Sequence, residues 1–261
     1  MYEKELNLNL KQIYASSAPL KECSNFKSSL YTECLFGEKV QTLLYEKSWT
    51  YCKTMFDNYK GWIHTSVLGN PKRFTHRIYA LRSYIYSFPD EKSTIIQYLP
   101  MGSKVWAKEI NDKWVKIFSP NSEKSIGYVP CSDMIEENIN VKDWVSIAEQ
   151  FVGTPYKWGG RDSLGIDCSA LIQISLETVN IKIPRDSCDQ IKFKKVRNID
   201  ICDIHRGSVI YWEGHVGVMI NKSMILHANA HHMKTVVEPL ADVIARAKDK
   251  KSKIIKIVNF I

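Results

Sequence analysis

The sequence contains a cysteine followed by two histidines in an order that suits nucleophilic catalysis: Cys168, His215 and His227. A thiolate can attack an amide carbonyl, and an imidazole can take the thiol proton and later protonate the leaving amine. Cys168 follows the loop 159–167 and precedes an apolar helical run, so we expect it in the first turn of a helix. Unpaired amide groups and the helix dipole at that position are expected to lower the pKa of the thiol.

The two histidines lie in short β-branched segments, 214–218 and 225–228. If these strands are antiparallel neighbours, both imidazoles can face the helix that carries Cys168. A lone cysteine or histidine in such surroundings is more often an ordinary core residue. The order of the motifs Asp-Cys-Ser, Gly-His-Val-Gly and apolar-apolar-His-Ala favours the catalytic interpretation.

Helical and extended patterns follow one another in the C-terminal half. Asn140 is expected to cap a helix that continues to Val152, where Gly153 and Pro155 end it. A second helix is expected from Cys168 through Leu176. Strands are expected at 208–212, 215–220, 223–228 and 235–237, and a short helix at 240–247. Helices first and strands after predict an α+β domain.

The N-terminal half contains an internal repeat. Residues 37–43 are echoed by 102–107 at an offset of 65, and residues 61–68 by 127–134 at an offset of 66. Short β-branched and aromatic runs separated by turn residues lie between these segments. This spacing is typical of small antiparallel barrels.

Composition excludes several classes of protein. Hydrophobic residues make up 44% of the chain and charged residues 25%, which excludes wholesale disorder. The net charge of +8 is spread along the chain, so we expect no nucleic-acid partner. No export signal and no apolar run of about 18 residues is present, and the seven cysteines include no CxxC pair. We therefore expect a cytoplasmic protein with reduced thiols, no membrane partner and no cofactor.

Residues 142–261 resemble the NlpC/P60 family of papain-like cysteine peptidases, which act on bacterial cell-wall peptides. Five segments carry the resemblance: 153–160, 165–171, 183–190, 206–212 and 214–218. The two repeats resemble bacterial SH3-like domains. Together they imply an α+β papain-like catalytic domain at 139–261, preceded by two small all-β SH3-like barrels at 1–72 and 73–138.

The resemblance also implies roles for individual residues. Cys168 would be the nucleophile, His215 the general base, and His227 the residue that orients the His215 ring. Tyr156 matches a family tyrosine that helps to hold the oxyanion together with the Cys168 backbone N–H. The sequence departs from the family pattern at Ala170, where glycine is more frequent, and at Ser208, where aspartate is more frequent.

Two SH3-like domains before such a domain resemble a subgroup that cleaves the γ-D-Glu–L-diamino-acid bond. The resemblance implies a short murein peptide substrate with a free N-terminal L-Ala, as in murein peptide recycling. Asp167 and Ser169 would bind the substrate ammonium, and Tyr59 would close the pocket. The third residue of the substrate, lysine or diaminopimelate, stays open, as does the oligomeric state.

Three alternatives compete with this interpretation. His227 and His231 are four residues apart with His232 beside them, a spacing that binds zinc on a helix, but His227 is expected to end a strand and no HExxH glutamate is present. We therefore predict no metal. The domain could instead cleave the glycan–peptide bond as an N-acetylmuramoyl-L-alanine amidase. It could also be a non-catalytic SH3-like wall- or partner-binding protein, which the intact cysteine and histidines argue against.

Overall fold

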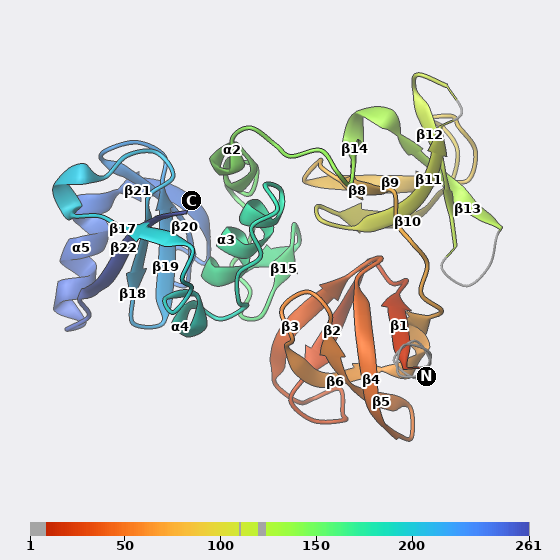
Figure 1. The fold of residues 1–261 in the computed structure, drawn as a ribbon, viewed down its shortest axis with the longest axis horizontal. Helices are drawn as coiled ribbons and strands as arrows, with labels where there is room; N and C mark the ends of the chain where they lie inside the picture. Colours follow the sequence, from red (N-terminus) through yellow and green to blue (C-terminus); the bar gives the residue numbers. More distant parts are fainter. Residues whose placement is uncertain (1–8, 110, 120–123, 261) are drawn as a thin grey trace. The chain divides into compact units, whose positions relative to one another are not determined.

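The protein is described by a computed structural model that covers residues 9–109, 111–119 and 124–260 (Figure 1). The chain divides into two compact units, residues 1–139 and 140–261. Among the described residues, no helix combines the length and the apolarity needed to cross a membrane. All seven cysteines are free thiols.

The N-terminal unit consists of two antiparallel sheets with the same topology. The strands of the first are β1 (Leu10–Ile13), β2 (Ser17–Lys21), β3 (Leu30–Leu35), β4 (Lys39–Glu46), β5 (Trp49–Thr54), β6 (Lys60–His64) and β7 (Leu68–Gly69). Those of the second are β8 (His76–Ile78), β9 (Arg82–Tyr86), β10 (Ile95–Pro100), β11 (Lys104–Glu109), β12 (Trp114–Phe118), β13 (Ser125–Pro130) and β14 (Met134–Glu136).

The strand orders of the two sheets are β3-β2-β6-β5-β4-β1-β7 and β10-β9-β13-β12-β11-β8-β14, which coincide when each label is advanced by seven. A short 3-10 helix precedes the last strand of each, Thr65–Val67 in the first and Cys131–Asp133 in the second. Each sheet encloses its own apolar core, around Ile13 and Ile63 in one and around Ile85 and Ile117 in the other. The internal repeat predicted from sequence is confirmed.

The paired glycines of the repeat, Gly37 and Gly102, both adopt a left-handed backbone, with φ of 81° and 87°. This conformation favours glycine and turns the chain into the following strand. The turn at Gly37 also meets the second sheet, because Lys104 N donates to Phe36 O at 2.8 Å and Phe36 is buried in the second core.

The C-terminal unit combines helices with a six-stranded antiparallel sheet of order β17-β22-β18-β19-β20-β21. Its helices are α2 (Trp144–Glu149), α3 (Cys168–Glu177), α4 (Ser187–Gln190) and α5 (Leu240–Asp249), with a 3-10 turn at Ile201–Asp203. Its strands are β17 (Val196–Asn198), β18 (Val209–Trp212), β19 (His215–Met219), β20 (Met224–Asn229), β21 (Lys234–Pro239) and β22 (Ile254–Phe260), besides the small hairpin β15 (Arg161–Asp162) and β16 (Gly165–Ile166). The predicted succession of helices and then strands is confirmed.

Helix α3 is the central helix of this unit and is buried on every side from Cys168 to Leu176. It packs against β19 and β20 and against α2. Helix α5 is amphipathic: Leu240 and Val243 join the apolar core with Trp212 and Ile225, while its other face carries charge. In Figure 1, α3 and α5 lie on opposite sides of the sheet.

The start of α2 differs from the sequence-based expectation. Asp143, not Asn140, is the N-cap, and its carboxylate accepts from Val145 N at 3.0 Å. Arg206 also binds the Asp143 carboxylate, which fixes the cap, whereas the Asn140 side chain pairs with Asn180. The regular helix ends at Glu149, and the residues up to Val152 form turns.

Both departures from the family pattern fit their surroundings. Ala170 is fully buried in α3, where alanine has the highest helix propensity. Ser208 is fully buried just before β18, and its hydroxyl accepts from His205 N at 3.1 Å. The serine hydroxyl therefore satisfies the backbone amide of His205 at this turn, a role that carboxylates also play.

Candidate active site

Cys168 is the first residue of α3, as predicted, and Asp167 is its N-cap. The thiol is buried, with 7% of the residue exposed. Burial and the nearby Asp167 carboxylate raise the pKa of Cys168 to about 12, outweighing the backbone N–H groups of Val216 and Ser169. The prediction that the helix start lowers this pKa is therefore wrong for the resting site, because desolvation dominates. The free enzyme holds a neutral thiol.

His215 and His227 lie on the neighbouring antiparallel strands β19 and β20, as predicted. His215 Nε2 and His227 Nδ1 are 2.7 Å apart, a hydrogen bond between the two rings. Burial, and then the neighbouring His227, lowers the pKa of His215 to about 3. Burial also lowers the pKa of His227. The pair is therefore neutral near pH 7.

The rings are not turned toward α3 as expected. Trp212 is paired with His215 across β18 and β19, and Trp212 packs in the core that α5 covers. Side chains alternate along a strand, so His215 projects to the α5 side, while Val216 projects to the other side. The Val216 backbone N–H, at the start of β19, lies near the Cys168 thiol and acts to lower its pKa. Within the described residues, no hydrogen bond joins the Cys168 thiol to the His215 ring.

Glu238, on β21, contacts the histidine pair through His227. Its Oε1 lies 2.7 Å from His227 Nε2, 2.5 Å from Arg246 Nη2 and 3.3 Å from His232 Nε2. Burial alone would raise the pKa of this carboxyl, but the hydrogen bonds from Arg246 and His227 lower it to about 2. Glu238 is therefore a carboxylate at neutral pH and can only accept hydrogen bonds.

This chain of hydrogen bonds determines where the imidazole protons lie. Because Glu238 only accepts, His227 Nε2 carries the proton and donates to it. The other nitrogen of a neutral His227 then accepts, so His215 Nε2 donates. His215 Nδ1 is left unprotonated. This is the ring nitrogen nearer to the backbone, and it is able to accept a proton.

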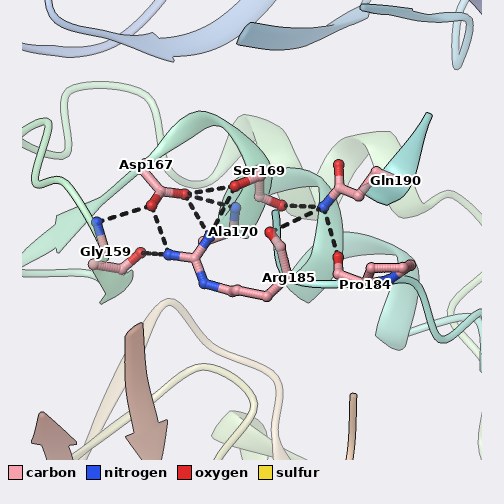
Figure 2. Close-up of polar contacts among 8 residues, drawn as sticks. Gly159, Asp167, Ser169, Ala170, Pro184, Arg185 and Gln190 are labelled. Carbon is pink, nitrogen blue, oxygen red and sulfur yellow. Dashed lines mark hydrogen bonds and ion pairs between the residues drawn. The ribbon is translucent and has the colours of Figure 1, made fainter. Parts of the chain in front are cut away.

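A second polar cluster surrounds the residue before the nucleophile (Figure 2). The Asp167 carboxylate forms a two-pronged ion pair with Arg185 Nη1 and Nη2, at 2.9 and 2.6 Å. It also accepts from Gly159 N, Ala170 N and Ser169 Oγ, at 2.9, 2.9 and 3.1 Å. Five donors thus converge on one carboxylate. Arg185 itself is fully buried, with 2% exposed.

The rest of this cluster ties three segments to the start of α3. Arg185 Nη1 donates to Ser169 Oγ at 2.8 Å. Gln190 Nε2, on α4, donates to Ser169 O and to Pro184 O, at 3.0 and 2.9 Å. These contacts fix α4 and the segment before it against the first turn of α3 (Figure 2).

The contacts of this cluster occupy the residues that were predicted to bind the substrate ammonium. Asp167 and Ser169 are both buried, and their polar side-chain atoms already pair with each other and with Arg185. A substrate ammonium would have to share or displace these bonds. The binding role of Asp167 and Ser169 stays a prediction.

The two predicted tyrosines lie in different units. Tyr156 is half-buried, and burial together with the charges of Cys168 and Asp167 raises its pKa to about 12. Its hydroxyl therefore stays protonated beside the thiol and can donate a hydrogen bond. Tyr59 belongs to the N-terminal unit, where its ring contacts Tyr31 at 6.1 Å. Its part in closing a pocket stays a prediction.

The alternative of a zinc site has no support in this geometry. His227 lies on a strand with both ring nitrogens hydrogen-bonded, and His231 and His232 follow in the turn before β21. Over the described ranges, no group of three histidine, cysteine or acidic side chains is arranged to hold a metal ion.

Four residues of these clusters were not singled out from sequence: Arg185, Gln190, Glu238 and Arg246. Arg185 and Gln190 lie in the family-like segment 183–190, and that resemblance was the available signal. Glu238 could have been found only from the register between the two strands. Since Val236 pairs with His227, Glu238 lies two residues further on the same face and reaches His227 diagonally.

Comparisons with known proteins identify the family of this domain. Residues 153–249 match the NlpC/P60 family. Dipeptidyl-peptidase 6 of Lysinibacillus sphaericus is 25% identical over 238 residues, covering 83% of this chain and 86% of that protein. The γ-D-glutamyl-L-lysine dipeptidyl-peptidase of Bacillus subtilis is 24% identical over 218 residues, covering 76% and 72%.

Solved structures extend the likeness to the fold. The crystal structure of an NlpC/P60 family protein from Bacillus cereus has a TM-score of 0.77 at 17% identity, covering 88% of this chain and 94% of that one. An NlpC/P60 endopeptidase from Photobacterium damselae has a TM-score of 0.65 at 13% identity, covering 97% and 73%. Residues 153–249 of this chain are thus an NlpC/P60 domain, homologous to dipeptidyl-peptidase 6 and to the γ-D-glutamyl-L-lysine dipeptidyl-peptidase.

Proposed function

We propose that the protein is a cysteine peptidase that hydrolyses the γ-D-Glu–L-diamino-acid bond of short cell-wall peptides with a free N-terminal L-Ala. The observation that carries the proposal is the hydrogen-bonded pair His215–His227, 2.7 Å apart, at the start of a strand whose next amide binds the Cys168 thiol. The Bacillus subtilis relative, a γ-D-glutamyl-L-lysine dipeptidyl-peptidase, supports the choice of bond.

The resting charges imply how the nucleophile forms. With a neutral thiol and a neutral imidazole, no thiolate is present before the substrate binds. As the γ-carbonyl of D-Glu approaches, the thiol proton passes to His215 Nδ1 and the sulfur bonds to the carbonyl carbon. His215 then gives this proton to the leaving amine. Water, deprotonated by the same nitrogen, hydrolyses the thioester and restores the thiol.

Oxyanion stabilisation requires donors that stay protonated. The Tyr156 hydroxyl meets that requirement, since its pKa is raised to about 12. The Cys168 backbone N–H is the second donor, because the first amides of a helix have no partner within the helix. Tyr156 is thus proposed to act on the transition state and not on the thiol.

For the substrate, we propose that Asp167 and Ser169 approach the free amine and that Tyr59 closes the pocket, with both repeats folding as SH3-like domains. A pocket closed at one end admits short peptides and excludes intact wall polymer. This selectivity suits a cytoplasmic enzyme of murein peptide recycling.

The test is product identification by mass spectrometry. Wild type, Cys168→Ala and Cys202→Ala are incubated with L-Ala-γ-D-Glu-L-Lys and its diaminopimelate counterpart, each with a free or an acetylated N-terminus. Cys202 is an exposed free thiol and serves as the matched control. We expect L-Ala-γ-D-Glu from wild type and Cys202→Ala only, and only from free-amine peptides.

Other outcomes would redirect the assignment. Turnover by Cys168→Ala would remove the nucleophile. Cleavage of the muramoyl–L-Ala bond in a muropeptide, with the tripeptides left intact, would indicate an amidase. Release of nothing from either substrate would leave a binding protein.

A further inference from the structure

A pocket of about 290 Å³ opens beside the two histidines, and all of its lining residues belong to the C-terminal unit. His215 and His227 form one side. Helix α5 forms another side with Arg246 and Lys250, and Trp212 contributes apolar surface. The histidine cluster borders this space, whereas no residue of the Asp167–Arg185 cluster lines it.

The pocket carries more positive than negative charge. Arg246 and Lys250 line it together with His231, and Glu213 is the one acid among the described lining residues. Arg246 uses Nη2 on Glu238, which leaves further N–H groups of its planar fork. Within the described part of the chain, the Lys250 ammonium has no hydrogen-bond or ion-pair partner, nor does the Glu213 carboxylate.

A buried donor in the lining is also unused. Asn229 is 7% exposed, and its Nδ2 has no hydrogen-bond partner among the described residues, while its Oδ1 accepts from His232 N at 2.8 Å. An unpaired buried donor is costly. A ligand with acceptor oxygens would remove this cost if a small shift of the side chain admitted it.

The reaction fixes which half of the substrate meets this pocket. His215 protonates the leaving amine, so the residue that carries this amine must lie against the imidazole. The remainder of that residue then extends into the space that His215 borders. For a diamino acid, this remainder is a carboxylate, an aliphatic chain and a distant ammonium.

We propose that this pocket binds the departing diamino acid, with its free carboxylate held by Lys250 and Arg246, its aliphatic chain against Trp212 and its distant ammonium near Glu213. The inference rests on the proposed function and adds to it a requirement for a free carboxylate on the third residue. Peptides that continue beyond this residue lack that carboxylate and are poor substrates. The enzyme is thereby selective for tripeptides.

The experiment compares L-Ala-γ-D-Glu-L-Lys with the same peptide ending in a carboxamide. Binding to the full-length Cys168→Ala protein is measured by calorimetry, and turnover is measured with the otherwise wild-type protein. We expect the free acid to bind about fivefold more tightly, the scale of one exposed ion pair. Adding Lys250→Gln should remove most of this preference. Adding Lys248→Gln, an exposed lysine of α5 outside the pocket lining, should preserve it.

The two readouts separate the two proposals. Equal binding of acid and amide, or a preference that survives Lys250→Gln, overturns the pocket assignment even if both peptides are cleaved. Tighter binding of the acid without cleavage of either peptide overturns the proposed function and keeps the pocket. Failure of both peptides to bind overturns the pocket assignment as well.

Discussion

Two arginine–carboxylate pairs flank the candidate site, and they differ in burial. The Arg185 and Asp167 side chains are 1% and 9% exposed, whereas those of Arg246 and Glu238 are 29% and 11% exposed. The first pair stands at the start of the helix that carries the nucleophile. The second stands behind the histidines.

The same chemistry therefore serves two purposes. Arg185 is buried and donates hydrogen bonds to Asp167, Ser169 and Gly160. It therefore joins segments that are distant in sequence. Arg246 keeps contact with solvent and polarises a carboxylate that two histidines share. We interpret the buried pair as part of the fold and the partly exposed pair as part of the proton chemistry.

The largest predicted effect is on stability at the buried pair. Arg185→Met leaves the Asp167 carboxylate buried without its counterion, which costs about 3–5 kcal/mol of unfolding free energy. Arg246→Met removes a partly exposed partner and leaves Glu238 its contacts with His227 and His232, so it should cost less, about 1–2 kcal/mol. Urea denaturation of both variants checks this. Equal losses would break the distinction between the two pairs.

The next effect is on activity at Glu238. Glu238→Ala removes the acceptor that fixes His227 Nε2–H, and through it the tautomer of His215. A lost hydrogen bond to a charged group predicts a fall in kcat/KM of about 10- to 100-fold. Glu238→Gln retains an oxygen acceptor and should lose much less.

The readout that separates positioning from mere stability is ¹⁵N NMR of the imidazoles. In wild type we expect a protonated Nε2 on both His215 and His227, and in Glu238→Ala a mixture of tautomers. Unchanged tautomers alongside lost activity would show that Glu238 acts in some other way.

We predict that the folded protein loses stability in acid because of the cluster around His215 and Glu238. The pKa of His215 falls from an ordinary 6.5 to about 3 on folding, so between these values the unfolded chain binds a proton that the folded chain does not. Stability should therefore decrease as the pH drops from 6.5 toward 3. Glu238, lowered from 4.5 to about 2, adds a loss below pH 4.5.

Melting temperatures between pH 4 and pH 8 check the acid sensitivity. His215→Asn should flatten the curve between pH 6.5 and 4.5, and Glu238→Gln should flatten it only below 4.5. A wild-type curve that is already flat between pH 6.5 and 4.5 would contradict a buried, uncharged His215.

The sequence predicted the elements better than the electrostatics. The helix at Cys168 and the strands of both histidines follow from local periodicity and turn residues, so they could be found from sequence. The pKa of Cys168 could not, because it depends on burial that arises only when α3 packs against the sheet. The helix start acts locally to lower the pKa of Cys168, and burial, which has the larger effect, raises it.

Contacts between residues that are far apart in the sequence were the second feature that could not be predicted. Arg185 lies 18 residues from Asp167, and Glu238 lies 11 residues from His227, but in both cases the partners lie on different segments, so no local period connects them. The face of the sheet on which His215 projects was also wrong from sequence. It depends on pairing with Trp212, whose burial under α5 is decided by tertiary contacts.

The smallest predicted effect is that of the Arg246 charge on the pKa of His215. Besides His227 and Glu238, the charges that act on His215 are those of Arg246 and Lys250, and both lower its pKa. Arg246→Met should therefore raise this pKa and move the acid limb of the kcat/KM profile to higher pH, with less than about a threefold change in rate at pH 8. Lys248→Met, at the last position but one of α5, removes a charge outside the pocket lining and should leave the limb in place. A limb that moves equally in both variants would assign the effect to net charge, and Arg246 would then differ from Arg185 only in burial and not in purpose.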